Sequence, residues 1–268
     1  MTEYVATSIA RRLIARMHAT HERRRISVFA GPPGIGKTTA IEEFAKRIEG
    51  QALIVKIGRR NARELLFLQH TLEALRIVTN ASSGNVPSSI WQLRTEIYET
   101  LCAWARLDPQ SARRGWYAAT AFPHLTIVLD EAQNLSREAI EGLRYWNDSD
   151  RCYAPFPLGL VFVGNNEFSL ASTSKESVIS AAVADRALYI QTYDYDDVTD
   201  DDLRLFIEAR VEIEDAALTL LLRTFKGPRA IRSLRRVSDH IDELAEVSAG
   251  RAITPADVRA HLDRAAAS

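Results

Sequence analysis

The sequence has few of the features that mark secreted, metal-stapled or membrane-spanning proteins. It contains only two cysteines in 268 residues, Cys102 and Cys152, which lie far apart with no second thiol near either. This argues against a disulfide framework or a zinc site and fits a reducing compartment. No apolar run approaches the roughly 20 residues of a membrane span, and Arg11, Arg12 and Arg16 interrupt the segment where a signal peptide would need an apolar core. We therefore expect a cytoplasmic protein that does not contact a membrane.

The sequence also lacks an excess of either charge. Its 34 basic and 35 acidic residues give a formal net charge of -1, so the overall charge does not indicate a polyanionic partner. Any surface for nucleic acid must then be local. The hydrophobic fraction of 46% is sufficient for a sizeable core, and neither internal repeats nor low-complexity tracts are present. These features predict a globular protein with one large domain, or with a core and a small second domain.

A glycine-rich segment near the N-terminus matches the phosphate-binding pattern GxxxxGK followed by Ser or Thr. A strand over residues 26–30 and a helix over residues 39–48 are predicted on either side of it, which is the context this motif requires. Backbone N–H groups of such a loop bind phosphate, Lys37 adds a point charge, and Thr38 offers a hydroxyl to Mg²⁺. The residues expected to contact a nucleotide are Gly31, Pro32, Pro33, Gly34, Ile35, Gly36, Lys37, Thr38 and Thr39.

Strand and helix patterns alternate through the first two thirds of the chain. Apolar runs predict strands over residues 26–30, 52–57, 124–131, 158–164 and 187–191. Amphipathic or apolar periodicity predicts helices over residues 7–24, 39–48, 62–77, 88–107 and 136–146, with a long loop over residues 108–124. This alternation predicts an α/β fold with a parallel sheet sandwiched between helices, and the glycine-rich motif within it is typical of a P-loop NTPase.

An acidic stretch marks the expected domain boundary. Six aspartates lie between Asp194 and Asp202, and Thr199 is a candidate N-cap whose following aspartates would favour the positive end of a helix. This structural role outweighs metal binding for the run. Three or four helices and no strand are predicted from there through Leu262. We therefore expect a nucleotide-binding core over residues 1–197 and a small all-helical lid over residues 198–268.

Polar residues follow two of the predicted strands at the edge where open parallel sheets bind ligands. Asp130 and Glu131 end the third strand; in a nucleotide site, Asp130 would hold Mg²⁺ through its hydration shell and Glu131 would polarise the attacking water. Asn165 ends the next strand and could orient that water, although a simple turn through Gly164 and Asn166 would also explain it. The predicted catalytic groups at this edge are therefore Glu131 and Asn165, with Lys37 from the loop.

Two arginines are candidates for contacts with the phosphates. Arg186 lies just before the fifth strand, where it could reach a nucleotide held by a neighbouring subunit; a surface salt bridge is the alternative. Arg229 begins a helix of the second domain and could touch the γ-phosphate, with Arg232 about one turn further along.

Taken together, these residues resemble a known superfamily. The segment 31–38, the pair 130–131, Asn165, Arg186 and the Gly-Pro-Arg229 step are similar to the Walker A, Walker B, sensor 1, arginine finger and sensor 2 motifs of AAA+ ATPases. The resemblance covers nearly the whole chain. Within that superfamily, residues 129–136, 141–147 and 161–165 resemble the transposition regulators MuB, TnsC and TniB, and secretion and helicase-loading ATPases share parts of the pattern.

The resemblance implies a function. It implies that the protein binds ATP and Mg²⁺, oligomerises as a ring or helical filament on double-stranded DNA without sequence specificity, recruits and activates a transposase at target DNA, and disassembles on hydrolysis. A targeting factor is a possible further partner. The sequence departs from MuB in lacking an N-terminal DNA-binding domain and from longer relatives in lacking extended tails, which weakens the expectation of a dedicated targeting partner.

The best local candidates for DNA contacts are Arg59, Arg60 and Arg63, with Arg94 and the pair 113–114 behind them. A solvated helix face is the alternative for each. Two other functions remain open. One is an AAA+ ATPase of the secretion or helicase-loader type that acts on protein partners, and the other is a nucleotide-gated scaffold in which hydrolysis is incidental.

Overall fold

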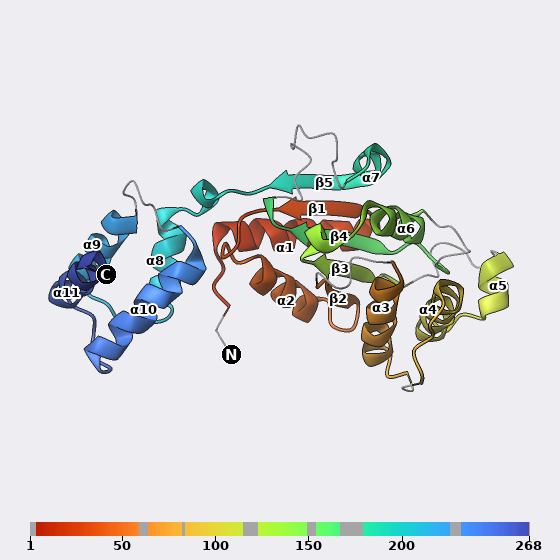
Figure 1. Cartoon of the computed structure of the whole chain (residues 1–268), viewed down its shortest axis with the longest axis horizontal. Helices are drawn as coiled ribbons and strands as arrows, with labels where there is room; N and C mark the ends of the chain where they lie inside the picture. Colours follow the sequence, from red (N-terminus) through yellow and green to blue (C-terminus); the bar gives the residue numbers. More distant parts are fainter. Residues whose placement is uncertain are drawn as a thin grey trace. The chain divides into compact units, whose positions relative to one another are not determined.

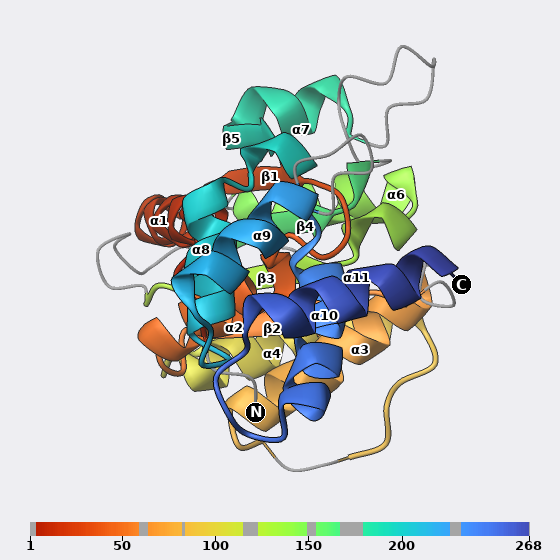
Figure 2. The same cartoon turned by 90° about the vertical axis from the view of Figure 1, so that its left-hand side faces the viewer.

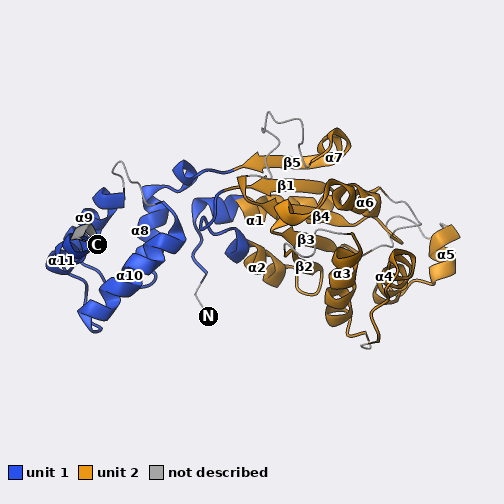
Figure 3. Ribbon diagram, in the orientation of Figure 1, with its two compact units in different colours: residues 1–12, 32–40, 193–268 blue, residues 13–31, 41–192 orange. Residues whose placement is uncertain are grey.

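The computed structural model describes residues 4–58, 64–81, 84–114, 123–148, 154–166, 179–225 and 232–267. The chain divides into two compact units, which Figure 3 colours separately. Residues 13–31 and 41–192 form the first, which we call the sheet unit. Residues 1–12, 32–40 and 193–268 form the second, which we call the helical unit. The glycine-rich loop thus belongs to the same unit as the C-terminal helices.

The sheet unit is built on five parallel strands in the order β2-β3-β4-β1-β5 (Figure 1). The strands are β1 (Ile26–Ala30), β2 (Ala52–Lys56), β3 (Thr126–Asp130), β4 (Gly159–Gly164) and β5 (Ala187–Thr192). Every residue of the three central strands is buried, whereas β2 and β5 at the edges are partly exposed. The predicted parallel sheet is confirmed, and all five strands lie where the sequence placed them to within two residues.

Helices surround these strands. They are α1 (Ser8–Arg23), α2 (Lys37–Arg47), α3 (Glu64–Val78), α4 (Ile90–Trp104), α5 (Pro109–Arg114), α6 (Arg137–Asn147) and α7 (Ala181–Arg186), with a 3-10 turn η3 (Ala132–Asn134) after β3. Helices α1 and α2 each begin in the helical unit and continue into the sheet unit. Ser136 caps α6, since its side chain accepts a hydrogen bond from the N–H of Ala139.

Successive strand residues face opposite sides of the sheet, and different helices cover the two sides. Side chains such as Val28 and Leu129 belong to a core shared with α3, α4 and α6. On the other face, the Ser27 hydroxyl is hydrogen-bonded to that of Thr20 on α1, with 2.6 Å between the oxygens. Figure 2 shows α1 and α2 on one side of the strands and α3 and α6 on the other. The predicted cover on both faces is confirmed.

After β5, the described residues of the helical unit form a 3-10 turn and four helices. They are η5 (Tyr195–Asp197), α8 (Asp200–Glu208), α9 (Asp215–Phe225), α10 (Leu234–Ser248) and α11 (Pro255–Ala267). The prediction of three or four helices is confirmed. No helix of the described residues is long and apolar enough to cross a membrane.

The acidic stretch is used to cap helices, as predicted. Thr199 accepts a hydrogen bond from the N–H of Asp202, whose carboxylate accepts one from the N–H of Thr199, so the two form a capping box. The Asp202 carboxylate also accepts hydrogen bonds of 2.6 Å from both the N–H and the hydroxyl of Ser8, at the start of α1. Burial opposes ionisation of this carboxyl, but the bonds from Ser8 and Thr199 outweigh it and hold the pKa of Asp202 below its usual value. Asp202 therefore joins α8 to α1.

Two short helices and one helix end were predicted wrongly. Residues 109–114 were placed in a loop but form α5, which Asp108 caps by accepting a hydrogen bond of 2.7 Å from the N–H of Ser111. Helix α7 was not predicted at all. Each has six residues and a single buried side chain, so hydrophobic periodicity could not reveal either. The helix predicted to run to residue 107 ends at Trp104, because Arg106 takes a left-handed conformation with φ of 56°.

Candidate functional site

The glycine-rich loop between β1 and α2 has the backbone of a phosphate-binding turn. Gly34 and Gly36 have φ of +79° and +90°, a left-handed region that glycine adopts without steric cost. A side chain at Gly34 would also collide with its surroundings, because a Cβ there would lie 2.2 Å from Oγ of Ser233. Lys37 is the first residue of α2, and its Nζ donates a hydrogen bond of 2.8 Å to the carbonyl oxygen of Pro32. The loop thus places a cation at the N-terminus of a helix, where anions bind.

The C-terminal helices contact this loop directly within the helical unit. The N–H of Leu234, the first residue of α10, donates a hydrogen bond of 2.7 Å to the carbonyl oxygen of Gly34. The hydroxyl of Tyr195 donates one of 3.1 Å to the carbonyl oxygen of Pro33. Two backbone carbonyls of the loop are thereby held by residues about 160 to 200 positions away in the chain. Tyr195 and Leu234 were not predicted, because no local pattern marks a partner so distant.

A second group of polar residues lies at the carboxyl edge of the sheet. Asp130 ends β3 and is 4% exposed; its Oδ1 accepts a hydrogen bond of 3.0 Å from the N–H of Glu131. Glu131 has φ of 58° and ψ of 37°, a left-handed conformation that costs on the order of 1 kcal/mol in a residue with a side chain. Such strain at a strand end, next to a buried carboxylate, is typical of functional sites.

Asn165 lies beside these carboxylates, as the strand order predicted. It follows β4, which is the neighbour of β3, and the register pairs Asp130 with Val163. The side chain of Gln133, on η3, connects the two strand ends. Its Nε2 donates a hydrogen bond of 2.6 Å to Oε2 of Glu131, and its Oε1 accepts one of 3.1 Å from the N–H of Asn165. Gln133 belongs to residues 129–136, which carry the resemblance to transposition regulators, but the sequence analysis gave it no role of its own; its position three residues after Asp130 was the available signal.

These residues fit a Mg²⁺-bound nucleotide. Mg²⁺ keeps several waters and takes one or two carboxylates together with substrate phosphates, so a single carboxylate such as Asp130 is sufficient on the protein side. Within the residues that the structure describes, no group of three or more His, Cys, Asp or Glu side chains is placed to hold a metal by itself. The side chains at this edge therefore suit Mg²⁺ that binds together with nucleotide phosphates, and they do not suit a structural metal held by the protein alone.

Arg186 lies at the opposite, amino edge of the sheet. It is the last residue of α7, directly before β5, and its side chain is 37% exposed. Its Nε donates a hydrogen bond of 2.6 Å to Oδ1 of Asp148, and its Nη1 donates one of 3.1 Å to the carbonyl oxygen of Ala182. Asp148 is also paired with Arg144. The surface salt bridge that the sequence analysis gave as the alternative role of Arg186 is therefore present. The guanidinium group of Arg186 is still partly exposed.

An open cleft surrounds Arg186. The residues that line it are Arg23, Arg24, Arg25, Asn147, Asp148, Pro157, Asp185 and Arg186. Arg25 donates hydrogen bonds to the carbonyl oxygen of Arg186, at 3.3 and 3.1 Å from Nε and Nη2. Four arginines against two aspartates leave this cleft with a net positive charge.

The remaining sequence candidates divide into two groups. Arg59, Arg60, Arg63 and Arg229 lie outside the described residues. Arg232 is described, and its Nη1 donates a hydrogen bond of 2.5 Å to the carbonyl oxygen of Val198, with Oδ1 of Asp200 3.7 Å from its Nη2. In this structure Arg232 therefore supports the segment that leads into α8.

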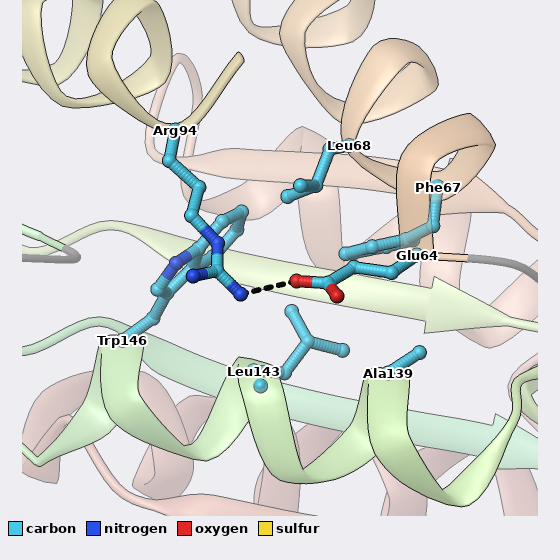
Figure 4. A pocket seen from close by; sticks show the side chains of 8 residues that line it. Glu64, Phe67, Leu68, Arg94, Ala139, Leu143 and Trp146 are labelled. Carbon is cyan, nitrogen blue, oxygen red and sulfur yellow. Dashed lines mark hydrogen bonds and ion pairs between the residues drawn. The ribbon is translucent and has the colours of Figure 1, made fainter. Parts of the chain in front are cut away.

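The arginines expected behind the DNA candidates have structural contacts. Arg94 is paired with Glu64, and both line a small cavity together with Phe67, Leu143 and other mostly apolar residues (Figure 4). The cavity volume of about 10 Å³ is enough for about one water and too small for a nucleotide. Arg113 lies over the ring of Tyr98, 4.8 Å from its centroid. These contacts favour a structural role for Arg94 and Arg113.

The fold is that of a P-loop NTPase, and solved structures share it across nearly the whole chain. Cdc6p from Pyrobaculum aerophilum aligns with a TM-score of 0.63 and 15% identity, over 98% of this chain and 69% of that one. A chain from the structure of Drosophila ORC bound to DNA aligns at 0.55 and 16%, over 97% and 60%, and a RuvB mutant from Thermotoga maritima at 0.51 and 16%, over 97% and 69%. At these identities the likeness shows the fold.

The family is shown by sequence. The model of an AAA domain family, AAA_22, matches residues 20–170, more than half of the chain, and the protein belongs to that family. The matched range includes the glycine-rich loop, Asp130, Glu131 and Asn165. A search of curated proteins finds no match. The class predicted from the motifs, an AAA+ nucleotide-binding protein, is confirmed.

Proposed function

We propose that the protein is an ATPase that assembles on double-stranded DNA in its ATP-bound form and is released by hydrolysis. The observation that carries the proposal is the left-handed glycine loop that delivers Lys37 to the N-terminus of α2. A loop of this geometry suits the β- and γ-phosphates of a nucleoside triphosphate, because its N–H groups, the helix terminus and the ammonium group all favour negative charge.

Each predicted site residue has a role in this proposal. Lys37 neutralises phosphate charge, Thr38 and Asp130 hold Mg²⁺, Glu131 accepts a proton from the attacking water, and Asn165 orients that water. Bound ATP and Mg²⁺ supply the transferable phosphoryl group and the neutralisation of its charge. We also propose that residues 198–268 act as a lid on the core of residues 1–197, with Arg229 contributing a charge to the γ-phosphate.

Arg186 supports assembly into a homo-oligomer. It lies at the edge of the sheet opposite Glu131, so both cannot act on the nucleotide of one copy. A head-to-tail contact between copies would bring the amino edge of one to the carboxyl edge of the next, and repetition of such contacts forms rings or helical filaments. Arg186 would then stabilise charge on a nucleotide held by the adjacent copy.

The proposed DNA and transposase partners rest on sequence resemblance and on the fold. Residues 129–136 and 141–147 resemble transposition regulators, and one structure with a similar fold, Drosophila ORC, is bound to DNA. A neutral protein can bind DNA as an oligomer, because successive copies repeat a few phosphate contacts along the backbone. We therefore propose non-specific binding of duplex DNA and recruitment of a transposase to it.

Assembly on duplex DNA tests this proposal. Electron microscopy or filter binding is done with a non-hydrolysable ATP analogue, with ADP and without nucleotide. We expect rings or filaments on DNA with the analogue alone. Lys37→Ala is expected to show none, because the β- and γ-phosphates lose their charge partner. ATP turnover without any DNA assembly would favour the alternative, an ATPase that acts on protein partners.

A further inference from the structure

The carboxyl edge of the sheet contains a side chain that links two strand ends and that the proposed function does not yet use. Gln133 bonds to Oε2 of Glu131 through its Nε2 and to the N–H of Asn165 through its Oε1. The two partners fix the orientation of the amide, because a backbone N–H only donates and an ionised carboxylate only accepts. A rotated amide would lose both bonds.

The turn that carries Gln133 is itself held firmly. Within η3, the N–H of Asn134 donates a hydrogen bond of 3.0 Å to the carbonyl oxygen of Glu131. The side-chain Nδ2 of Asn134 donates another, of 2.8 Å, to the carbonyl oxygen of Ile57, the residue that follows β2. Ala132 beside it is completely buried. Gln133 therefore reaches Glu131 and Asn165 from an anchored backbone, so its amide can define where their atoms lie.

Glu131 needs such a partner more than most carboxylates do. A glutamate side chain rotates about three bonds, and the left-handed backbone at Glu131 is a conformation that needs surrounding contacts to persist. A general base loses efficiency steeply when its position shifts by about 1 Å. A hydrogen bond of 2.6 Å to an amide removes much of this freedom.

We propose that Gln133 is a positioning residue, which holds the carboxylate of Glu131 for catalysis and couples it to the end of β4 at Asn165. The inference rests on the proposed ATPase function. Loss of Gln133 therefore affects catalysis and ATP binding differently. It lowers kcat, because the carboxylate of Glu131 is no longer held, and it leaves ATP binding by the glycine-rich loop intact. Movement at Asn165 would reach Glu131 through the same amide.

Two substitutions separate the two hydrogen bonds. Gln133→Met keeps the length of the side chain and removes both bonds, whereas Gln133→Glu keeps an acceptor for the N–H of Asn165 and replaces the donor to Glu131 with a second carboxylate, which repels Glu131. Gln110→Met, at an exposed position of α5, is the matched control. We expect kcat to fall by about tenfold or more in both Gln133 variants with KM for ATP within error of the control, by analogy with other groups that orient a catalytic residue. Tm should stay within error of the control in Gln133→Met and fall in Gln133→Glu, because two carboxylates then repel each other.

A second measurement does not depend on activity. Hydrogen exchange of the Asn165 amide, followed by NMR, should become faster in Gln133→Met and stay slow in Gln110→Met, because only the first variant loses the acceptor. Unchanged exchange in Gln133→Met would overturn the proposed link, and full kcat in either Gln133 variant would overturn the positioning role. The proposed function itself would be contradicted if the wild-type protein did not hydrolyse ATP, or if Glu131→Gln hydrolysed it as fast as the wild type. Either result would hold whatever the hydrogen exchange of the Asn165 amide shows.

Discussion

The two edges of the sheet differ in charge, burial and the way the chain builds them. At the carboxyl edge, a buried carboxylate, a strained glutamate and two amide side chains follow directly from the ends of adjacent strands. At the amino edge, the arginines come from the ends of helices α1 and α7, and they line an open cleft. One edge is acidic and tightly bonded, and the other is basic and accessible.

In the proposed head-to-tail assembly, this difference would let a single chain carry two halves of one site. All the strands are parallel, so residues at their two ends are separated by the length of a strand and cannot meet within one copy. If copies stack head to tail, the acidic edge of one copy faces the basic edge of the next. Such charge complementarity contributes more to the correct orientation of the two copies than to the affinity between them.

The largest expected effect is at the carboxyl edge. Glu131→Gln keeps the shape of the side chain and removes the carboxylate that would accept the proton, so we expect kcat for ATP hydrolysis to fall by about a hundredfold or more. ATP binding should persist, and assemblies on DNA should accumulate because release needs hydrolysis. Phosphate release assays and electron microscopy measure the two effects. Comparable turnover in mutant and wild type would contradict the role of Glu131.

The next effect sharpens the comparison at the amino edge. We expect Arg186→Ala to reduce kcat by about tenfold to a hundredfold, because the nucleotide of the adjacent copy loses a positive charge. Mixing Arg186→Ala with Glu131→Gln should restore part of the activity, since some interfaces then combine an intact Glu131 with an intact Arg186. Steady-state ATPase assays over a range of mixing ratios give the measurement.

Controls in the same cleft separate this role from a salt bridge. Arg23→Ala removes an exposed arginine of the cleft without touching the pair between Arg186 and Asp148, and it should leave the ATPase rate unchanged. If Arg186 only stabilises the fold, its loss should lower Tm and no mixture should recover activity. That result would leave the amino edge without a part in catalysis.

The two edges also differed in how far the sequence predicted them. The sequence predicted that Asp130, Glu131 and Asn165 lie close together, because each follows a predicted strand and the carboxyl ends of parallel strands meet at one edge of the sheet. Arg186 was identified from its place before a strand. Arg23 and Arg25 were missed because basic residues at the end of an amphipathic helix are the usual solvated pattern. Gln133 was missed because its two partners depend on the exact turn after β3, which no periodicity encodes.

The smallest effect concerns a buried histidine at the amino edge. The Nδ1 of His21, on α1, lies 3.0 Å from the hydroxyl of Thr126 at the start of β3, and the ring of His124 is 5.4 Å away. Burial is the main cause that lowers the pKa of His21, and the nearby His124 lowers it further; a hydrogen bond with Gln51 opposes them in part. Neutral His21 is therefore the form that the folded state favours.

The sign of the pH dependence follows from this shift. The unfolded chain takes up a proton near pH 6.5, whereas folded His21 does so only at lower pH, so the stability that His21 contributes is present above about pH 6.5 and is lost as pH falls below it. His21→Gln should therefore weaken the fall in unfolding free energy between pH 7.5 and 5.5, measured by urea denaturation at each pH. His70→Gln, on the exposed surface of α3, is the matched substitution at a second histidine. If the unfolding free energy of His21→Gln fell with pH as steeply as that of the wild type, protonation of His21 at the amino edge would not be a cause of the lost stability.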